Sequence, residues 1–456
     1  MSTGVSTARA RQLAETERRT FAQARPRSLA LTEQARATMP QGVPMAWMAE
    51  FYDHPTVWVE SGRGAHFTDV DHHTYLDFFV GDHSAFCGHA PAAVVRAVTE
   101  QVKKGTQFLL PGEDAVVVAE QLARRYGLSQ WQFTLSATTA NVEVLRLARE
   151  LTGREVLVMF DGKYHGHFDP ALVVEEGGRV VPEFRGLTGD VAHHARVVPF
   201  NDVAALERAL SPADVALVLA EPAMTNAGFL LPEAGFHDAV RELTRASGTL
   251  LCLDETHTLV CAHGGLTRLW GLEPDLVTVG KSIAGGVPLG AYGMTEPVAA
   301  LLRGADTPWA AGTVVGEVAT GGTLFANALS MAAARAALTE VLTDAAFTRT
   351  SALGDRLAGG LRRLFTALPW SVNQVGAHAS YFFAPVPPTS GARAREVDDA
   401  ELRSLIRLYL ANRGVWESGW WLGPTVSVEH TAADVDTYLG VFEELLSALR
   451  SSADPG

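Results

Sequence analysis

The sequence lacks the features of secreted, membrane-spanning and metal-binding proteins. Its first 28 residues contain no apolar core of signal-peptide length, and no segment of the 456 residues approaches the length needed to cross a bilayer. The three cysteines, Cys87, Cys252 and Cys261, do not have the spacing of a metal site, and their odd number suits a reducing environment. We therefore expect a soluble, cytoplasmic protein with no membrane partner and no metal.

Positive charge is also scarce. The chain has 37 Lys and Arg against 51 Asp and Glu, so its formal net charge is −14. A surface with this balance repels a polyanion, which argues against nucleic acid as a partner. Internal repeats and low-complexity blocks are absent as well, so a repeat protein is not expected.

What remains is the composition of a globular enzyme, 47% hydrophobic and 19% charged. Short apolar runs alternate with helical patterns through the middle of the chain, and this alternation predicts an α/β fold with a mostly parallel sheet. Residues 345–456 show helices mixed with short apolar strands, which predicts a separate, smaller α+β layer.

Two of the apolar runs each end in a charged residue. Residues 249–253 lead into Asp254, and residues 276–279 lead into Lys281. The carboxyl ends of parallel strands meet at one edge of a sheet, so we expect the carboxylate and the amine to lie close together. Pyridoxal phosphate binds to a lysine as a Schiff base and needs an acidic partner at its ring nitrogen. Taken alone, the pair also fits a solvent-exposed loop lysine and a helix-capping aspartate.

Small residues precede two helical patterns. Ser136, Ala137 and Thr138 stand before the first, and a Gly-Gly-Thr turn that ends in Thr323 stands before the second. A helix N-terminus has free N–H groups that bind phosphate, although simple helix capping needs the same residues. Tyr164 follows another apolar run, where an aromatic side chain can stack on a flat ring.

Seven segments occur together in the order of one family. They are SATTANVEVLRLAR (136–149), YHGH (164–167), EPAMTNAG (221–228), DET (254–256), PDLVTVGKSIAGGVPLGAYG (274–293), GGTLFAN (321–327) and VSVEHT (426–431). Through them the chain resembles the class III pyridoxal-phosphate-dependent aminotransferases, especially the subgroup that includes glutamate-semialdehyde aminomutase. The resemblance extends from about residue 40 to about residue 445.

The resemblance implies a fold-type-I enzyme. Such an enzyme has a large doubly wound α/β domain with a mostly parallel seven-stranded sheet, a smaller α+β domain built from both chain ends, and a homodimer with its sites at the interface. The expected division is an N-terminal helical arm (1–38), the N-terminal part of the small domain (39–80), the large pyridoxal-phosphate-binding domain (81–340) and the C-terminal small domain (341–456).

The resemblance also assigns roles in cofactor binding. Lys281 resembles the Schiff-base lysine, and Asp254 the partner of the ring nitrogen. Thr323 resembles the residue that completes the phosphate site of the neighbouring subunit. The other expected cofactor-binding residues are Ser136, Ala137 and Thr138 at the phosphate, Tyr164 and His165 at the ring, Glu221 and Asn226 near the ring hydroxyl, and Thr256 and His257 after Asp254.

Departures from the family pattern bear on the substrate. The segment PQGVPMAWM (40–48) resembles an aminomutase stretch that carries a carboxylate-binding arginine, but this chain has Met45, Trp47 and Met48 there. An apolar or aromatic substrate is therefore expected rather than a dicarboxylate, with core tryptophans as the alternative explanation for the aromatic residues. The predicted substrate residues are His83, Trp47, Trp420 and Trp421.

The function expected first is an aminotransferase that moves an amino group from a primary amine or amino acid to a carbonyl acceptor. An intramolecular aminomutase of the glutamate-semialdehyde type is the second expectation. An ammonia-lyase or racemase with the same cofactor is the third, because fold and cofactor do not fix the reaction type.

Overall fold

The computed structural model describes residues 3–303, 318, 320–418 and 422–450, which form two compact units. The first unit contains Met1–Pro91, Thr348–Pro388 and Ala394–Gly456, and the second contains Ala92–Phe347 and Thr389–Arg393. The first unit is thus built mainly from the two ends of the chain, and the second from its middle.

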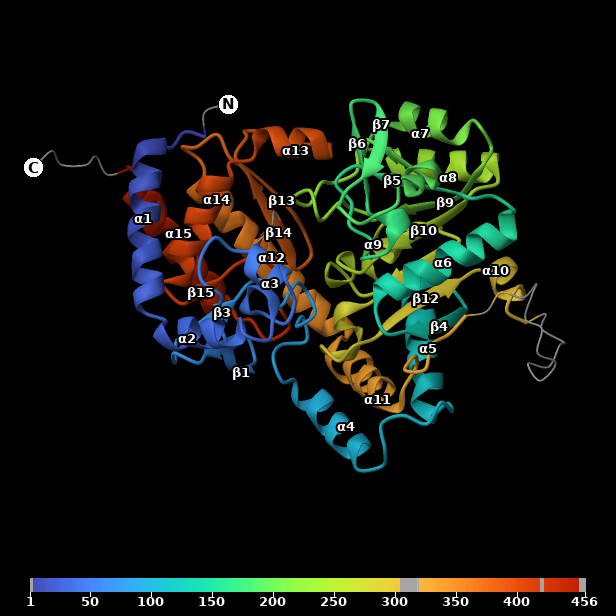
Figure 1. Cartoon of the computed structure of the whole chain (residues 1–456), viewed down its shortest axis with the longest axis horizontal. Helices are drawn as coiled ribbons and strands as arrows, with labels where there is room; N and C mark the ends of the chain where they lie inside the picture. The colour runs from blue at the N-terminus through green and yellow to red at the C-terminus, as the bar shows by residue number, and fades with distance from the viewer. Residues whose placement is uncertain (1–2, 304–317, 319, 419–421, 451–456) are drawn as a thin grey trace, which may run out of the picture. The chain divides into compact units, whose positions relative to one another are not determined.

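A seven-stranded sheet forms the core of the second unit (Figure 1). Its strands, in spatial order, are β4 (Gln130–Thr134), β12 (Gly290–Met294), β11 (Leu276–Val279), β10 (Leu250–Asp254), β9 (Val215–Ala220), β5 (Val156–Phe160) and β8 (Ala195–Val198). Neighbours from β11 to β8 are parallel, whereas β12 is antiparallel to both β11 and β4. All the strands except β12 therefore point the same way, which confirms the predicted sheet.

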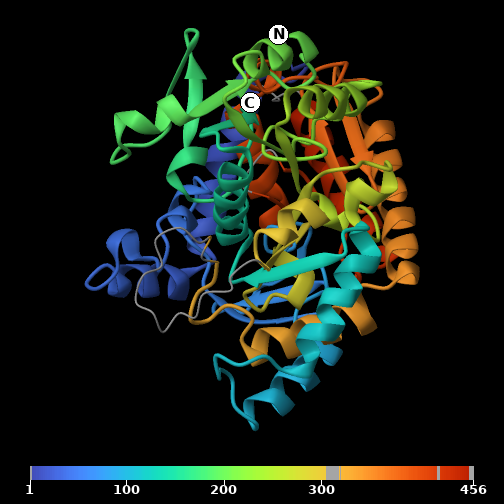
Figure 2. The ribbon, with the colours of Figure 1, turned by 90° about the vertical axis from the view of Figure 1, so that its right-hand side faces the viewer.

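Helices cover both faces of this sheet. Strands β5, β9, β11 and β12 are buried along their whole length, as expected for strands covered on two sides. Met159 and Phe160 of β5 point to opposite faces. Met159 shares a buried cluster with Val144 of α6 (Ala137–Thr152), whereas the Phe160 ring lies 5.5 Å from that of Phe236 in α8 (Phe236–Ser247). The unit is therefore doubly wound, and Figure 2 shows it after a quarter turn.

Shorter elements complete the second unit. They are α4 (Ala92–Val102), α5 (Glu113–Tyr126), α7 (Val203–Leu210), α9 (Gly265–Leu269), α10 (Glu296–Ala300), α11 (Ala328–Ala336) and the hairpin of β6 (Val173–Glu176) and β7 (Arg179–Pro182). Among the residues that the structure describes, every helix is too short or too polar to span a membrane.

The first unit combines helices with two small sheets. Its helices are α1 (Thr7–Gln23), α2 (Pro26–Ala35), α3 (Trp47–Glu50), α14 (Ala400–Ala411) and α15 (Ala432–Arg450). Its strands are β1 (Val59–Arg63), β2 (His66–Asp69), β3 (Thr74–Asp77), β15 (Val415–Trp416), β13 (Ser371–Val375) and β14 (His378–Phe382). The chain passes between the units four times: between residues 91 and 92, within α12 (Asp344–Leu364), between residues 388 and 389, and within α13 (Gly391–Val397).

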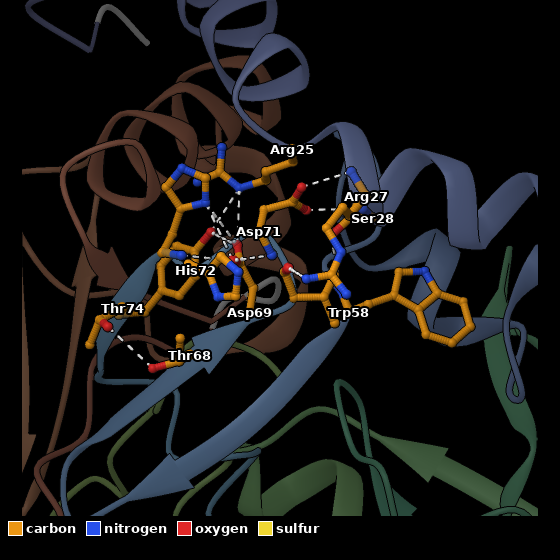
Figure 3. A network of polar contacts seen from close by, with 12 residues as sticks. Arg25, Arg27, Ser28, Trp58, Thr68, Asp69, Asp71, His72 and Thr74 are labelled. Atoms are coloured by element: carbon orange, nitrogen blue, oxygen red, sulfur yellow. Dashed lines mark hydrogen bonds and ion pairs between the residues drawn. The ribbon is translucent and has the colours of Figure 1, made fainter.

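A buried polar network ties the N-terminal helices to the hairpin of β2 and β3 (Figure 3). The Arg25 Nε donates to the Tyr75 hydroxyl at 2.7 Å, and this hydroxyl donates to Asp69 Oδ2 at 2.7 Å. In the turn between β2 and β3, Asp71 Oδ2 accepts from the Ser28 backbone N–H at 2.9 Å and thereby caps the start of α2. Because Arg25 and Asp69 are almost fully buried, these bonds satisfy charges that would otherwise destabilise the fold.

Candidate active site

Six strands of the large sheet end at one edge, and five of them carry residues of the predicted site at or just beyond their ends. Strand β4 has the same direction as β11 because both are antiparallel to β12. The carboxyl ends of β4, β5, β9, β10 and β11 therefore lie together, at the position where α/β proteins bind ligands. The residues at or just beyond these ends include, in the same order, Ser136, Tyr164, Glu221, Asp254 and Lys281.

Asp254, the last residue of β10, is a buried carboxylate surrounded by donors. Its Oδ2 lies 2.9 Å from His165 Nδ1 and accepts from Asn141 Nδ2 at 2.9 Å. Its Oδ1 accepts from the backbone N–H of Thr256 at 3.1 Å and from the Thr256 hydroxyl at 2.5 Å. Burial alone would raise the pKa of Asp254, but the bonds and charge of these neighbours outweigh it and lower the pKa to about 2. The group is ionised at neutral pH.

Glu221 has the opposite electrostatic character. It follows β9 and is buried. Burial, together with the charge of Asp254, raises the pKa of Glu221 to about 8, although hydrogen bonds from Thr225 and Asn226 act to lower that pKa. Glu221 Oε2 accepts from the Thr225 backbone N–H at 3.2 Å and from the Thr225 hydroxyl. Its Oε1 has no bonding partner among the described residues. Two neighbouring carboxyl groups therefore differ in charge near pH 7.

Lys281 begins a short 3₁₀ turn, Lys281–Ala284, directly beyond β11. Its backbone φ of 53° is left-handed, a conformation that costs free energy for a residue with a side chain and that is often found at functional sites. A Cβ at the preceding Gly280 would lie 3.0 Å from the Ala137 Cβ. Glycine at 280 thus lets the lysine turn approach the start of α6 closely.

The start of α6 is the predicted phosphate site, and its first turn is held by a capping box. Ser136 caps the helix: its Oγ accepts from the Thr139 N–H at 3.2 Å, and the Thr139 Oγ1 accepts from the Ser136 N–H at 3.1 Å. The helix itself has no acceptor for the N–H groups of Ala137 and Thr138. A Cβ at Gly166 would lie 2.2 Å from Thr138 Oγ1, so the segment after β5 lies directly against this helix end.

The remaining predicted cofactor residues fall around this edge or near it. Tyr164 is half-buried in the segment after β5, and Asn226 donates to the Thr225 hydroxyl at 3.3 Å. His257 is buried, with its Nδ1 2.5 Å from Thr225 Oγ1. Thr323 is exposed, and its backbone carbonyl accepts from the Gln107 side chain.

Two of the predicted substrate residues, His83 and Trp47, lie in the first unit. His83 is buried in the first unit, where its Nε2 lies 2.9 Å from Thr425 Oγ1 and its ring 5.0 Å from that of His378. Trp47 begins α3 of the same unit, with its ring 5.7 Å from that of Phe51. Trp420 and Trp421 lie outside the described residues. The substrate roles of these four residues stay predictions.

Sequence reasoning missed two residues that organise the site. Asn141 donates to Asp254 Oδ2 and, at 2.8 Å, to the His165 carbonyl, so it joins α6 to the end of β10 and to the segment after β5. It lies three residues after Thr138, on the same face of the helix. An amide among apolar residues on a buried helix face indicates a hydrogen-bonding partner and could have identified Asn141 from the sequence. Thr225 links Glu221 with His257, and only its position inside EPAMTNAG pointed to it.

These residues fit pyridoxal phosphate. Lys281 could offer the amine, Asp254 an ionised oxygen pair for the ring nitrogen, and the α6 N-terminus N–H groups for the phosphate. His165 Nε2 is buried without a bonding partner among the described residues, as expected for a polar atom that faces a bound group. No cluster of three or more metal-ligating side chains occurs within the described ranges. A doubly wound sheet with this site defines a pyridoxal-phosphate-dependent enzyme of fold type I.

Comparisons with known proteins agree. The model of the class-III aminotransferases matches residues 47–384. A glutamate-1-semialdehyde 2,1-aminomutase from Chloroflexus aggregans is 34% identical over 446 residues, which cover 93% of this chain and 98% of that protein. The crystal structure of a glutamate-1-semialdehyde-aminomutase from Pseudomonas aeruginosa superposes with a TM-score of 0.92 at 38% identity, covering 98% of this chain and 100% of the other.

An omega-transaminase from Sphaerobacter thermophilus has a TM-score of 0.85 at 30% identity, with 93% of this chain and 98% of the other covered. The matches extend over nearly the whole chain. This protein belongs to the class III aminotransferase family, and the resemblance, the fold class and the cofactor predicted from the sequence are confirmed.

Proposed function

We propose that this enzyme moves an amino group within one small molecule, as the 2,1-aminomutases that it resembles are named for doing. The observation that carries the proposal is full-length similarity: two aminomutases match at least 93% of the chain at 34% and 38% identity, whereas the omega-transaminase matches at 30%. This similarity favours intramolecular transfer over the intermolecular transfer that the sequence placed first.

The residues of the site support either reaction. Bound pyridoxal phosphate would supply an electron sink for the substrate carbon that carries the amino group. Lys281 would hold the cofactor, and its Nζ would then take a proton from one substrate carbon and return it to another. Asp254, ionised and held by three side chains, would keep the ring nitrogen protonated. Ala137 and Thr138 would bind the phosphate.

Intermolecular transfer with an apolar or aromatic amine is the second candidate, and one observation favours it. Met45 and Met48 are 46% and 43% exposed in the segment where the resembling aminomutase stretch carries an arginine. An exposed thioether cannot pair with a carboxylate, so a substrate without that group suits this segment better.

A two-part incubation separates the candidates. The purified holoenzyme is given glutamate 1-semialdehyde alone, and separately a panel of apolar and aromatic amines with and without pyruvate or 2-oxoglutarate. Isomerisation of the semialdehyde without a second carbonyl compound supports the aminomutase. Amino transfer that depends on an added acceptor, with no isomerisation, contradicts it and supports the second candidate, and ammonia release without an acceptor supports a lyase.

We also propose that the enzyme is a cytoplasmic homodimer. Three consecutive large apolar side chains are exposed: Phe108 by 54%, Leu109 by 71% and Leu110 by 74%. Such an exposed apolar run is typical of a protein interface. Thr323 accepts from Gln107, next to this run, which supports its predicted role at the phosphate of the neighbouring subunit. All three cysteines are buried thiols, which suits a reducing compartment.

A further inference from the structure

A hydrogen-bonded chain joins the two strand ends next to Asp254. Glu221 follows β9 and His257 follows β10, and the Thr225 hydroxyl lies between them. Thr225 Oγ1 is 2.5 Å from His257 Nδ1 and in contact with Glu221 Oε2, whereas Nδ1 and Oε2 are 4.0 Å apart. Glu221, Thr225 and His257 are all buried. The imidazole therefore reaches the carboxyl group through the hydroxyl.

The hydroxyl has one hydrogen, so the chain has two arrangements. In one, Glu221 is a carboxylate, the Thr225 hydroxyl donates to it, and His257 Nδ1 donates to the hydroxyl. In the other, Glu221 is a carboxylic acid that donates to Thr225 Oγ1, and the hydroxyl donates to His257 Nδ1. The second becomes the first when the Glu221 proton moves to Thr225 Oγ1 while the Thr225 proton moves to His257 Nδ1. No other proton and no electron is transferred.

We propose that Glu221, Thr225 and His257 form a buried proton-transfer chain that sets the charge next to Asp254. When Glu221 holds the proton, Asp254 is the one negative carboxyl group of the pair. When His257 holds it, a second carboxylate lies beside Asp254, balanced by an imidazolium. Because Asp254 is the residue predicted to face the ring nitrogen, this choice changes the electrostatic field at that nitrogen. The three residues position charge and are not proposed to touch the reacting atoms.

Several titratable groups surround the chain. Asp254 and His257 come from β10 and the segment after it, His165 comes from the segment after β5, and His237 of α8 bonds the Pro222 carbonyl at 2.7 Å. The Asp254 charge opposes a second negative charge, which agrees with the raised pKa of Glu221, about 8, caused first by burial. The inference rests on the cofactor family and is independent of which reaction the enzyme catalyses.

Infrared spectroscopy of the holoenzyme tests the chain without measuring turnover. The carbonyl band of the buried carboxylic acid, assigned by its absence in Glu221→Gln, is followed from about pH 6 to about pH 10. We expect its loss with a midpoint near pH 8, where the chain releases one proton to solvent and is left with a Glu221 carboxylate and a neutral imidazole that donates from Nδ1. In Thr225→Val the midpoint should rise by about one unit, because the hydroxyl that stabilises the carboxylate is removed. Thr225→Ser should restore the wild-type midpoint.

A double-mutant cycle separates the chain from direct electrostatics. His257→Phe should shift the midpoint in the wild-type background, and the shift should disappear in the Thr225→Val background. His237→Phe is the matched control and should leave the midpoint unchanged in both the wild-type and the Thr225→Val background. An equal His257→Phe shift in both backgrounds, or none in the wild type, overturns the proposal, as does a Glu221 that stays ionised at pH 6. If His257→Phe gives no folded holoenzyme, His257→Gln takes its place in the same cycle.

Discussion

At the scale of single residues, the site depends on two carboxyl groups that the fold keeps in different states. Asp254 has a pKa near 2 because His165, Thr256 and Asn141 oppose the effect of burial, whereas Glu221 has a pKa near 8 because burial and the Asp254 charge prevail. Groups whose environments separate their pKa values in this way mark acid and base roles in enzymes. Asp254 is therefore suited to hold a positive ring nitrogen, and Glu221 is not.

Replacing Asp254 tests this assignment. Asp254→Asn keeps the shape but removes the charge, so we expect the turnover of cofactor-loaded enzyme to fall by at least about 100-fold. Asp275→Asn is the control, because Asp275 is bound by Arg241 at the opposite end of β11. It should lower the melting temperature with little effect on turnover. Near wild-type turnover in Asp254→Asn would show that the carboxylate does not serve the ring nitrogen.

Gly166 tests the close contact at the helix start. In Gly166→Ala a Cβ would lie 2.2 Å from Thr138 Oγ1 at a φ of +103°. Gly186→Ala has a similar φ of +92° in open space and isolates the backbone cost, about 1 to 2 kcal/mol. Both should lower the melting temperature, but only Gly166→Ala should raise the Kd for pyridoxal phosphate. Equal Kd values in titrations of the two apoenzymes would contradict the phosphate site.

The sequence alone was enough to predict the site residues that stand at or just beyond the ends of strands. Asp254 and Lys281 end or follow apolar runs, so their meeting at one edge could be predicted from sheet geometry. The bonds of Asn141 and Thr225 could not, because they join segments far apart in the sequence, and local patterns carry no record of such pairs. His83 was assigned from its place ahead of a helical pattern and Trp47 from the comparison with the aminomutase stretch, and their substrate roles stay predictions.

At the scale of elements, the capped α6 N-terminus is the predicted phosphate site. Ser136→Ala should destabilise the apoenzyme by about 1 kcal/mol through loss of the cap. Asp202 caps α7, because its Oδ1 accepts from the Ala205 N–H at 2.8 Å. Asp202→Ala should therefore lower the free energy of unfolding by a similar amount. Only Ser136→Ala should weaken binding of pyridoxal phosphate, by about fivefold. A similar loss of affinity in both variants would show a general effect of stability.

The apolar runs at 249–253 and 276–279 became β10 and β11 because a strand buried on both faces needs nearly every side chain to be apolar. The reversed direction of β12 was not predicted. Its sequence, Gly290–Met294, is as apolar as that of its parallel neighbours, so composition does not encode strand direction. The short connection from β11 to β12 decides it, since a parallel crossover needs a longer one.

At the scale of the whole molecule, the proposed dimer is tested by the apolar run. The double variant Leu109→Asp, Leu110→Asp places two charges on side chains that are 71% and 74% exposed, where they disturb an interface and not the core. Val386→Asp changes a side chain that is 71% exposed in the first unit and is the control. Sedimentation equilibrium should give the mass of two chains for the wild type and the control, and of one chain for the double variant. A monomeric wild type would contradict the dimer.

The central claim is that Lys281 holds pyridoxal phosphate, and peptide mapping tests it directly. The chain has four lysines, at positions 103, 104, 163 and 281, so the attachment site can be assigned without ambiguity. The holoenzyme is reduced with borohydride, which makes the bond between cofactor and amine permanent, and its peptides are analysed by mass spectrometry. The account predicts a phosphopyridoxyl group on the peptide that contains Lys281 and none in Lys281→Ala. The same group on Lys103, Lys104 or Lys163, or on no lysine, would contradict it.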